Sequence, residues 1–321
     1  MAIARPWRAP RPDGPYAATP EDHAALNHVF SEAFTERYRR DGLVGVRVPF
    51  LNPSIWRYAI EDANGGALIW RDEHDEIAAF NIVHCSGREG WMGPLAVRPD
   101  AQGAGLGKEI VKSGIDWLVA SKALTIGLET MPRTMDNIGF YSSLGFAPGR
   151  LTVTIDAGPA TEMPTLFGRL SASDKEAVLV ECCARSQSVL TACDFTREIA
   201  ITDGLGLGET VLFREGGKLT GFALCHTVPL VEGRAREETR VLKLVLSRQS
   251  DLATAVTTLA DFARRGGTRR VAFRVQTEYL DAYQQLIAMG GRVRWTDLRM
   301  ALAAYPEGKA RDGLLWSNWE I

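Results

Sequence analysis

The chain contains few residues of the kinds that bind metals or form disulfides. Its five cysteines include no C-x-x-C pair, and its five histidines are scattered along the sequence. An odd number of cysteines without paired spacing predicts reduced thiols, as in a cytoplasmic protein. Histidines without ligand spacing argue against a zinc site. We therefore expect no bound metal.

Long apolar runs and an excess of one charge are also missing. No run approaches the roughly 20 apolar residues that cross a membrane, and residues 1–8 carry charge without the apolar core of a secretory signal. The net charge of −2 gives no basis for binding nucleic acid or an anionic membrane. We expect a cytoplasmic protein with neither of these partners.

The length and composition are those of a globular protein with two domains. The 321 residues are 45% hydrophobic and 24% charged, which allows two cores of ordinary size. Proline-rich residues 1–15 predict an irregular arm, and residues 156–160 have the composition of a linker.

A glycine-rich stretch stands out in the first half. An apolar run, 91–97, precedes Gly103, Gly105 and Gly107, and residues 108–118 then show apolar positions at helical spacing. This order predicts a strand, a glycine turn and the N-terminus of a helix. Free backbone N–H groups and the positive end of the helix dipole would meet at that point. Glycines there accept positive φ and let a phosphate approach the backbone, so the stretch predicts an anion site.

Two well-known phosphate patterns do not fit this stretch. A P-loop needs G-x-x-x-x-G-K-[ST], but Gln102 occupies the first glycine position and Glu109 follows Lys108. A dinucleotide turn needs G-x-G-x-x-G, and the glycines here are evenly spaced. The stretch instead resembles the V-x-P-x-x-Q/R-x-x-G-x-G/A motif of the GNAT acetyltransferase superfamily, complete from Val97 to Gly107.

A second segment carries the same resemblance. Residues 137–146, with Tyr141, are similar to the family's A-x-x-F-Y-x-x-L-G-F segment, although Thr134 stands where the family often has asparagine. The predicted elements also follow the family's order over 16–156. We expect a first helix that starts at Thr19–Asp22 and a second helix over 52–60. A hairpin of 67–71 with 77–84 should follow, and then strands at 91–97 and 124–130. A helix capped by Thr134 and ended by Gly145 and a strand pair within 146–155 complete the order.

The resemblance implies a fold and an activity. The fold is of the α/β (α+β) class, with two tandem GNAT folds, each a mixed and mostly antiparallel sheet flanked by helices. The activity is an acetyl-CoA-dependent N-acetyltransferase that moves an acetyl group directly to a primary amine, with a small molecule as the expected acceptor. Acetyl-CoA is thus the implied cosubstrate.

The same resemblance implies roles for individual residues. The backbone of Leu95, Ala96 and Val97 would pair with the pantetheine arm like an added strand. Tyr141 would contact the cosubstrate and act as general acid toward the leaving thiolate. The pyrophosphate would be held by the backbone N–H groups of Gln102, Gly103, Ala104, Gly105, Leu106 and Gly107.

The general base is less closely specified. Glu129 lies in the predicted strand 124–130, beside the expected cleft, where it could deprotonate the amine through water or hold a neighbouring backbone amide. We favour a water molecule as the proton acceptor. Glu32, Glu36 and Asp41, near the expected acceptor wall, could attract an amine or form a solvated helix face.

The second half repeats the pattern of the first. Residues 219–226 match 77–84 at an offset of 142, so that Phe222 and His226 correspond to Phe80 and His84. A repeat of this length indicates a duplicated domain, over 165–306. Because the two histidines recur in both copies, we expect them to be structural.

The second copy has lost the features that carry the chemistry. Its strand 241–246 continues into Ser247–Asp251 without the glycines that the first copy has. When Gly290 is aligned with Gly145, Leu286 occupies the place of Tyr141. We therefore expect a degenerate partner that walls the acceptor site or forms the surface of a homodimer. The apolar tail, 307–321, should dock onto the protein.

Two alternatives remain. In the mycothiol synthases, which are tandem acetyltransferases of similar length, the C-terminal copy is the working one, but here the motifs lie in the first half. A non-catalytic acyl-CoA-binding or regulatory module would keep the glycine turn and would have no need of Tyr141.

Overall fold

A computed structural model describes residues 11–103, 105–157, 164–310 and 312–319. Within these residues the strands form one 13-stranded sheet in the order β1-β2-β3-β4-β5-β12-β6-β11-β10-β9-β8-β7, with β13 beside β10. The pairs β4–β5 and β10–β11 are parallel, and the other strand pairs among the described residues are antiparallel. The predicted mixed, mostly antiparallel pairing flanked by helices is confirmed, but the two expected sheets are joined into one continuous sheet. None of the described helices combines the length and the apolar character needed to cross a membrane.

The elements of the first half are, in chain order, β1 (Asp13–Ala17), η1 (Pro20–Asp22), α1 (His23–Arg40), α2 (Pro53–Ala63), β2 (Ala67–Arg71), β3 (Ile77–Ser86), β4 (Glu89–Val97), η2 (Pro99–Ala101), α3 (Leu106–Ala120), β5 (Thr125–Thr130), α4 (Met135–Ser142) and β6 (Phe146–Ala157). Those of the second half are β7 (Thr165–Leu166), η3 (Phe167–Arg169), α5 (Ala172–Val189), α6 (Thr196–Gly204), β8 (Gly208–Glu215), β9 (Lys218–His226), β10 (Glu238–Leu246), η4 (Gln249–Asp251), α7 (Leu252–Arg265), β11 (Arg270–Gln276), α8 (Leu280–Ala288), β12 (Arg292–Leu302) and β13 (Leu314–Ser317).

Helices cover both faces of the sheet in the first half. In β2, Ala67 and Ile69 join the core beneath α1 and α2, whereas Leu68 and Trp70 join the core beneath α3. Successive side chains of a strand point to opposite faces, so a strand covered on both faces is apolar at every position. This explains why the strands of the sequence read as continuous apolar runs.

The predicted helix starts hold with small changes. Thr19 and Asp22 form a capping box around the short turn η1, and α1 follows directly. Asn52 caps α2 by accepting a hydrogen bond from the backbone N–H of Ser54. Thr134 is the N-cap residue of α4, as predicted, but its side chain does not cap the helix: the hydroxyl donates to the carboxylate of Asp41 at 3.2 Å instead.

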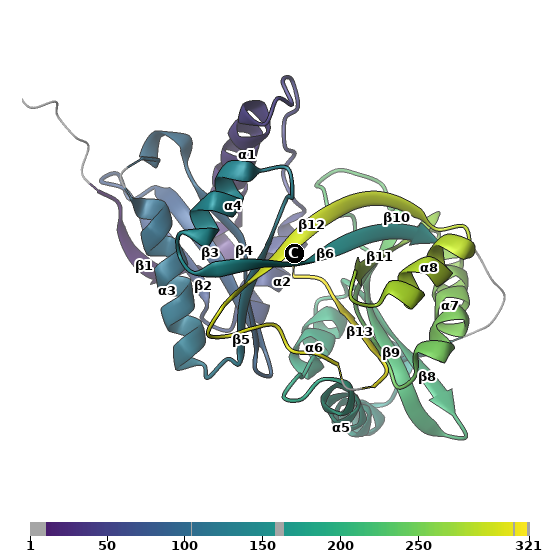
Figure 1. The fold of residues 1–321 in the computed structure, drawn as a ribbon. Coiled ribbons are helices and arrows are strands. Elements are labelled where there is room, and N and C mark those ends of the chain that lie inside the picture. The colour runs from purple at the N-terminus through teal and green to yellow at the C-terminus, as the bar shows by residue number, and fades with distance from the viewer. Residues whose placement is uncertain (1–10, 104, 158–163, 311, 320–321) are drawn as a thin grey trace, which may run out of the picture.

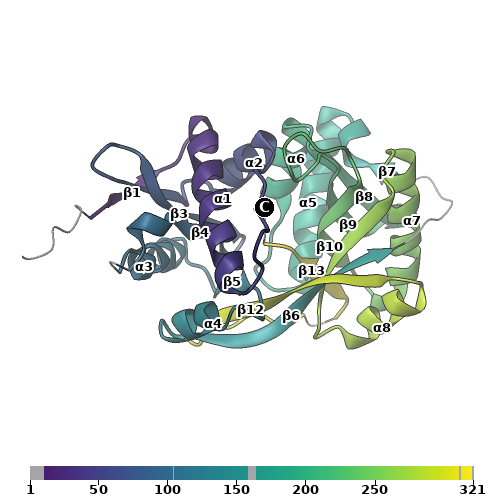
Figure 2. The same cartoon turned by 90° about the horizontal axis from the view of Figure 1, so that it is seen from above.

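The two halves exchange their last long strands. Residues 146–155, expected to form a strand pair, belong to a single strand, β6, which lies between β12 and β11 of the second half. In return, β12 pairs with β5 of the first half. Figure 1 shows β6 and β12 as a long curved pair running between the two lobes. In the view of Figure 2, α2 of the first lobe lies beside α6 of the second, and these two helices are in contact.

Candidate active site

Strands β4 and β5 run together for four residue pairs and then separate. The parallel pairing extends from Glu89 opposite Thr125 to Met92 opposite Leu128, and no pair follows. At the same point the register of β3 and β4 shifts by one residue, so that Gly93 and Pro94 of β4 lie opposite the single residue Ile82 of β3 and form a bulge. Residues 95–97 then pair with β3 on one edge, and no described strand occupies the other. The two diverging strands therefore form an open cleft.

The glycine turn lies at the end of this cleft. Gly103 and Gly105 both have φ of +85°, and a Cβ atom added at either would meet nothing within 4 Å. Gly105 is the N-cap of α3, and no side chain caps the first helical turn. Uncapped N–H groups next to open space fit an anionic group of a ligand. Ala104 lies outside the described residues.

Two positions of the turn have roles that the sequence did not suggest. A Cβ on Gly107 would lie 3.5 Å from the ring of Phe140, an ordinary van der Waals contact, so Gly107 faces α4 and not the open space that surrounds Gly103 and Gly105. The side-chain amide of Gln102 donates to the carbonyl of Val97 at 2.9 Å. Gln102 thus ties the turn back to the end of β4, and the Val97 carbonyl already has one partner.

A cavity of about 550 Å³ opens from the cleft and is walled by both halves of the chain. Its apolar wall comes largely from the first half, with Phe30, Phe34, Met92, Leu95, Leu128 and Tyr141, and the second half adds Leu230, Val241 and Trp295. Its charged wall comes largely from the second half, with Glu238, Arg240, Arg274, Arg294 and Asp297, and the chain end adds Asn318 and Trp319. The volume is that of a small-molecule site.

Tyr141 lies on α4 at the edge of this cavity. Its ring packs against Phe140 and Phe146, and the residue is 7% exposed. Burial raises the pKa of its phenol to about 12. The hydroxyl has no hydrogen-bond partner among the described residues, so it is a protonated donor at the cavity wall.

Glu129 also lines the cavity, but its carboxylate is held by other side chains. The Thr152 hydroxyl donates to it at 2.6 Å, and guanidinium groups of Arg274 and Arg299 lie 3.4 Å and 3.7 Å away. Its side chain is 3% exposed. The two arginines come from β11 and β12, so the second half determines the surroundings of this first-half carboxylate.

The equivalent cleft of the second half is filled. Strands β10 and β11 also pair in parallel for four residues, from Glu238 opposite Arg270 to Val241 opposite Phe273. Beyond that point β13 pairs antiparallel with β10, from Lys243 opposite Ser317 to Leu246 opposite Leu314. The chain's own tail thus occupies the opening that stays free in the first half.

Side chains of the second half hold the tail in place. The Gln276 side chain donates to the carbonyl of Ser317 at 2.9 Å and accepts from its N–H at 3.1 Å. The hydroxyl of Tyr279 accepts from the N–H of Leu315 at 3.2 Å. Trp316 is buried in the core with Phe273.

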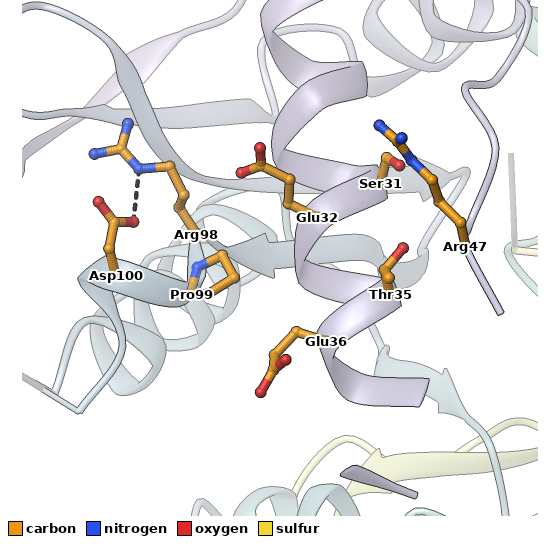
Figure 3. A pocket seen from close by; sticks show the side chains of 8 residues that line it. All are labelled: Ser31, Glu32, Thr35, Glu36, Arg47, Arg98, Pro99 and Asp100. Atoms are coloured by element: carbon orange, nitrogen blue, oxygen red, sulfur yellow. Dashed lines mark hydrogen bonds and ion pairs between the residues drawn. The ribbon is translucent and has the colours of Figure 1, made fainter. Parts of the chain in front are cut away.

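The acidic residues of α1 do not face the cavity. Glu36 forms ion pairs with Arg39 and Arg40, and hydrogen bonds from these two arginines lower its pKa to about 2. Glu32 and Glu36 instead line a surface groove of about 470 Å³ between α1 and η2, together with Arg98 and Asp100, which pair with each other (Figure 3). A solvated, ion-paired helix face is the interpretation that these contacts support.

Several cavity residues were missed by the sequence analysis. Asn137 lies one turn before Tyr141 and lines the cavity, whereas Thr134 does not. The charged residues of β10, β11 and β12 give no local signal, because only the strand exchange brings them to the first half.

The comparisons with known proteins agree with this architecture. Residues 24–146 match the model of the acetyltransferase (GNAT) family. No curated protein matches the chain in sequence. A proposed acetyltransferase from Pyrococcus horikoshii is similar in structure, with 17% identity, a TM-score of 0.63, and coverage of 89% of this chain and 88% of that one.

Two further solved structures share the fold over most of their length. The GCN5-related N-acetyltransferase from Sphaerobacter thermophilus has 17% identity and a TM-score of 0.56, covering 90% of this chain and 95% of that one. A tandem GNAT protein from the clavulanic acid biosynthesis pathway has 12% identity and a TM-score of 0.58, covering 92% and 98%. At these identities the likeness establishes the fold.

Proposed function

We propose that the first half of the chain, whose residues 24–146 match the model of the acetyltransferase (GNAT) family, transfers an acetyl group from acetyl-CoA to a primary amine. The observation that carries the proposal is the open cleft between β4 and β5, which ends at an uncapped helix start and borders the Tyr141 hydroxyl. The cavity of about 550 Å³ between the halves suits a small-molecule acceptor.

The residues present fit acetyl-CoA as the cosubstrate. Backbone N–H groups of 102–107 would hold its pyrophosphate at the positive end of α3. The free edge of Leu95, Ala96 and Val97 would pair with its pantetheine arm. The second half supports this assignment, since there the corresponding edge of β10 already accepts an added strand, β13.

The reaction requires one bond to form, one to break and one proton to move. The amine nitrogen bonds to the acyl carbon, the carbon–sulfur bond breaks, and the proton that leaves the amine ends on the sulfur. A phenol with a pKa of about 12 is a weaker acid than a thiol of about 8.5, so complete transfer from Tyr141 to a free thiolate is uphill by roughly 5 kcal/mol. We therefore assign Tyr141 the hydrogen bond to the departing sulfur, with the amine's proton completing the thiol.

The contacts of Glu129 favour water as the group that first accepts the amine proton. The carboxylate already accepts a hydrogen bond from Thr152 and lies beside two guanidinium groups. Glu129 as a base acting through water is the second candidate, because the residue does line the cavity. A non-catalytic acyl-CoA-binding module is the alternative function, and turnover of an amine distinguishes it from an enzyme.

The test is calorimetric titration of acetyl-CoA into the wild-type protein and into two glycine variants. Gly105→Glu places a carboxylate at the turn and should abolish binding. Gly217→Glu is the matched control, since Gly217 has φ of +80°, open space around its Cβ, and a place in the β8–β9 turn. We expect one molecule bound per chain in the wild type and in the control. No binding to the wild type would refute the proposal, and two molecules per chain would contradict a filled second cleft.

A further inference from the structure

A line of hydrogen bonds joins the second half to the bulge of β4. From α6, Arg197 Nε donates to Asp62 Oδ1 at 3.1 Å, and its Nη2 donates to the carbonyl of Cys85 at 2.7 Å. The other oxygen of Asp62, Oδ2, lies 2.9 Å from Nδ1 of His84. The second ring nitrogen of His84, Nε2, lies 3.2 Å from the carbonyl oxygen of Gly93. Gly93 is part of the bulge and lines the cavity.

The partners of His84 determine its protonation. A carboxylate and a backbone carbonyl are both acceptors, so each ring nitrogen must carry a hydrogen. A histidine that donates from both nitrogens is an imidazolium cation. His84 is buried, at 3% exposed, and Asp62, at 4%, supplies the opposite charge. Burial alone would raise the pKa of Asp62, but the hydrogen bond from His84 and the charges of His84 and Arg197 lower it below its usual range.

The second half contains the same histidine without this arrangement. His226 follows His84 at an offset of 142, but its neighbour is the hydroxyl of Thr202, 3.0 Å from Nε2, in place of a carboxylate. Its Nδ1 has no hydrogen-bond partner among the described residues. Burial, followed by the charge of Arg240, lowers the pKa of His226 well below its usual value, so this ring is neutral. The half with the filled cleft thus lacks the charged pair.

We propose that His84 is a positioning residue: as an imidazolium held between Asp62 and the Gly93 carbonyl, and braced by Arg197 of the second half, it fixes the β4 bulge where the acyl-CoA cleft opens. This inference rests on the proposed function, because the cleft is the acetyl-CoA site assigned above. It gives the degenerate half a role in the reaction, since α6 determines the orientation of Asp62 and thereby of the bulge.

Other charged groups lie around this line. Glu198 of α6 accepts a hydrogen bond from the Ser86 hydroxyl, and Lys243 of β10 donates to the carbonyl of Asn318 at 2.8 Å. The charge of Lys243 lowers the pKa of both Asp62 and Glu198, and the charge of Asp62 raises the pKa of Glu198. Neither Glu198 nor Lys243 is hydrogen-bonded to His84, so the ring's two donors go to Asp62 and Gly93 alone among the described residues.

The first part of the test is the protonation state of His84, measured independently of activity. The chain has five histidines, so a ¹⁵N NMR spectrum of the rings is simple enough to assign by comparing wild type with His84→Gln. We expect both nitrogens of His84 to show imidazolium shifts at pH 7.5 and those of His226 to show a neutral ring. Asp62→Thr, which copies Thr202 of the second half, should abolish the imidazolium signal. A neutral His84 in the wild type would overturn the proposal.

The second part measures whether the line of contacts acts on the cleft. His84→Gln should weaken acetyl-CoA binding about tenfold, which corresponds to roughly 1.4 kcal/mol. Arg197→Gln, at a side chain that is 34% exposed and does not line the cavity, should weaken it about threefold, and Arg197→Lys should restore part of that loss. His226→Gln is the matched control and should leave the affinity within twofold.

The outcomes separate this inference from the proposed function. If the wild type binds no acetyl-CoA, the proposed function fails, and the ring spectrum still decides the state of His84. If the wild type binds but His84→Gln and His226→Gln change the affinity equally, the role of His84 is general stability and the positioning proposal is wrong. If His84→Gln does not fold, the acetyl-CoA affinities of Arg197→Gln and Arg197→Lys decide the same question. Equal affinities for these two variants and the wild type would then contradict the positioning proposal.

Discussion

Trp319 stacks on Trp91, with their ring centroids 5.5 Å apart and 11° between the planes. The contact joins the end of the chain to β4 of the first half. Each indole also has a cation over its ring: the Lys243 ammonium lies 3.3 Å from the centroid of Trp319, and the Arg299 guanidinium lies 4.1 Å from that of Trp91. The tail therefore fills the cleft of its own half and also supports the strand that forms the cleft of the other.

Trp319→Ala should destabilise the whole protein. The residue is 5% exposed and belongs to a core that also contains Trp91 and Phe195. Loss of a buried tryptophan side chain costs about 3–5 kcal/mol through lost contacts and the cavity left behind. Urea unfolding measures the change, and Trp319→Phe should recover part of it. An unchanged midpoint would show that the tail rests on the surface without contributing to stability.

Tyr141→Phe should reduce kcat about a hundredfold and leave acetyl-CoA affinity within threefold, because only the hydroxyl is removed. The pKa of about 12 also predicts the pH profile. Tyr141 is active as a donor while protonated, so it imposes no fall in kcat between pH 7 and pH 10. Steady-state rates over that range, with binding measured in parallel, check both points. Equal losses in affinity and kcat would indicate a packing role for the ring.

Glu129→Gln should cost stability without shifting the pH profile of kcat. The variant leaves Arg274 and Arg299 beside a neutral amide. Removing one charged partner of a buried ion pair lowers the free energy of unfolding by about 3 kcal/mol. Gln keeps an acceptor for the Thr152 hydroxyl. If water takes the amine proton, the profile keeps its shape. A large loss of kcat with a displaced acidic limb would identify Glu129 as the base.

The sequence predicted those features of the site that depend on residues close together in the chain. It did not predict the contacts between residues that are far apart in the chain. The turn through Gly103 and Gly105 and the position of Tyr141 depend on residues close in the chain, so pattern and resemblance were sufficient. The two arginines beside Glu129 lie on strands more than 140 residues away, and the apolar pattern of a strand does not say which neighbour it pairs with. Gly107 shows the same limit, because the nearest neighbour of a Cβ added there, the ring of Phe140, lies on another helix.

The tail shows the same division. Its apolar residues predicted docking, but the place where it docks depends on the divergence of β10 and β11, which is a property of the folded sheet. The histidine repeat likewise predicted structural roles for both rings. Only the side chains opposite them, Asp62 and Thr202, make one ring charged and the other neutral.

Glu198→Gln should change how stability depends on pH. Burial, and then the charge of Asp62, raises the pKa of Glu198 to about 7, whereas an unfolded glutamate titrates near 4.3. The stability that this group contributes is present below about pH 4 and is lost as pH rises through about 7. The unfolding free energy of the variant minus that of the wild type should therefore rise by about 2.5 kcal/mol from pH 5 to pH 8. Glu237→Gln, at an exposed position, is the control, and parallel pH curves for wild type and Glu198→Gln would contradict the prediction.

The exchanged strands predict that the first half does not fold alone. Met300 of β12 is fully buried in the core of the first half, and Leu298 and Leu302 pack against that core. A fragment of residues 1–163 lacks these side chains and leaves β5 and β6 with unpaired edges, which favour aggregation. We expect the fragment to show no cooperative unfolding and no acetyl-CoA binding, and co-expression with residues 164–321 to restore both. A cooperatively folded fragment that binds acetyl-CoA would mean that the first half completes its own sheet, and the second half would then be needed only for the wall of the acceptor cavity.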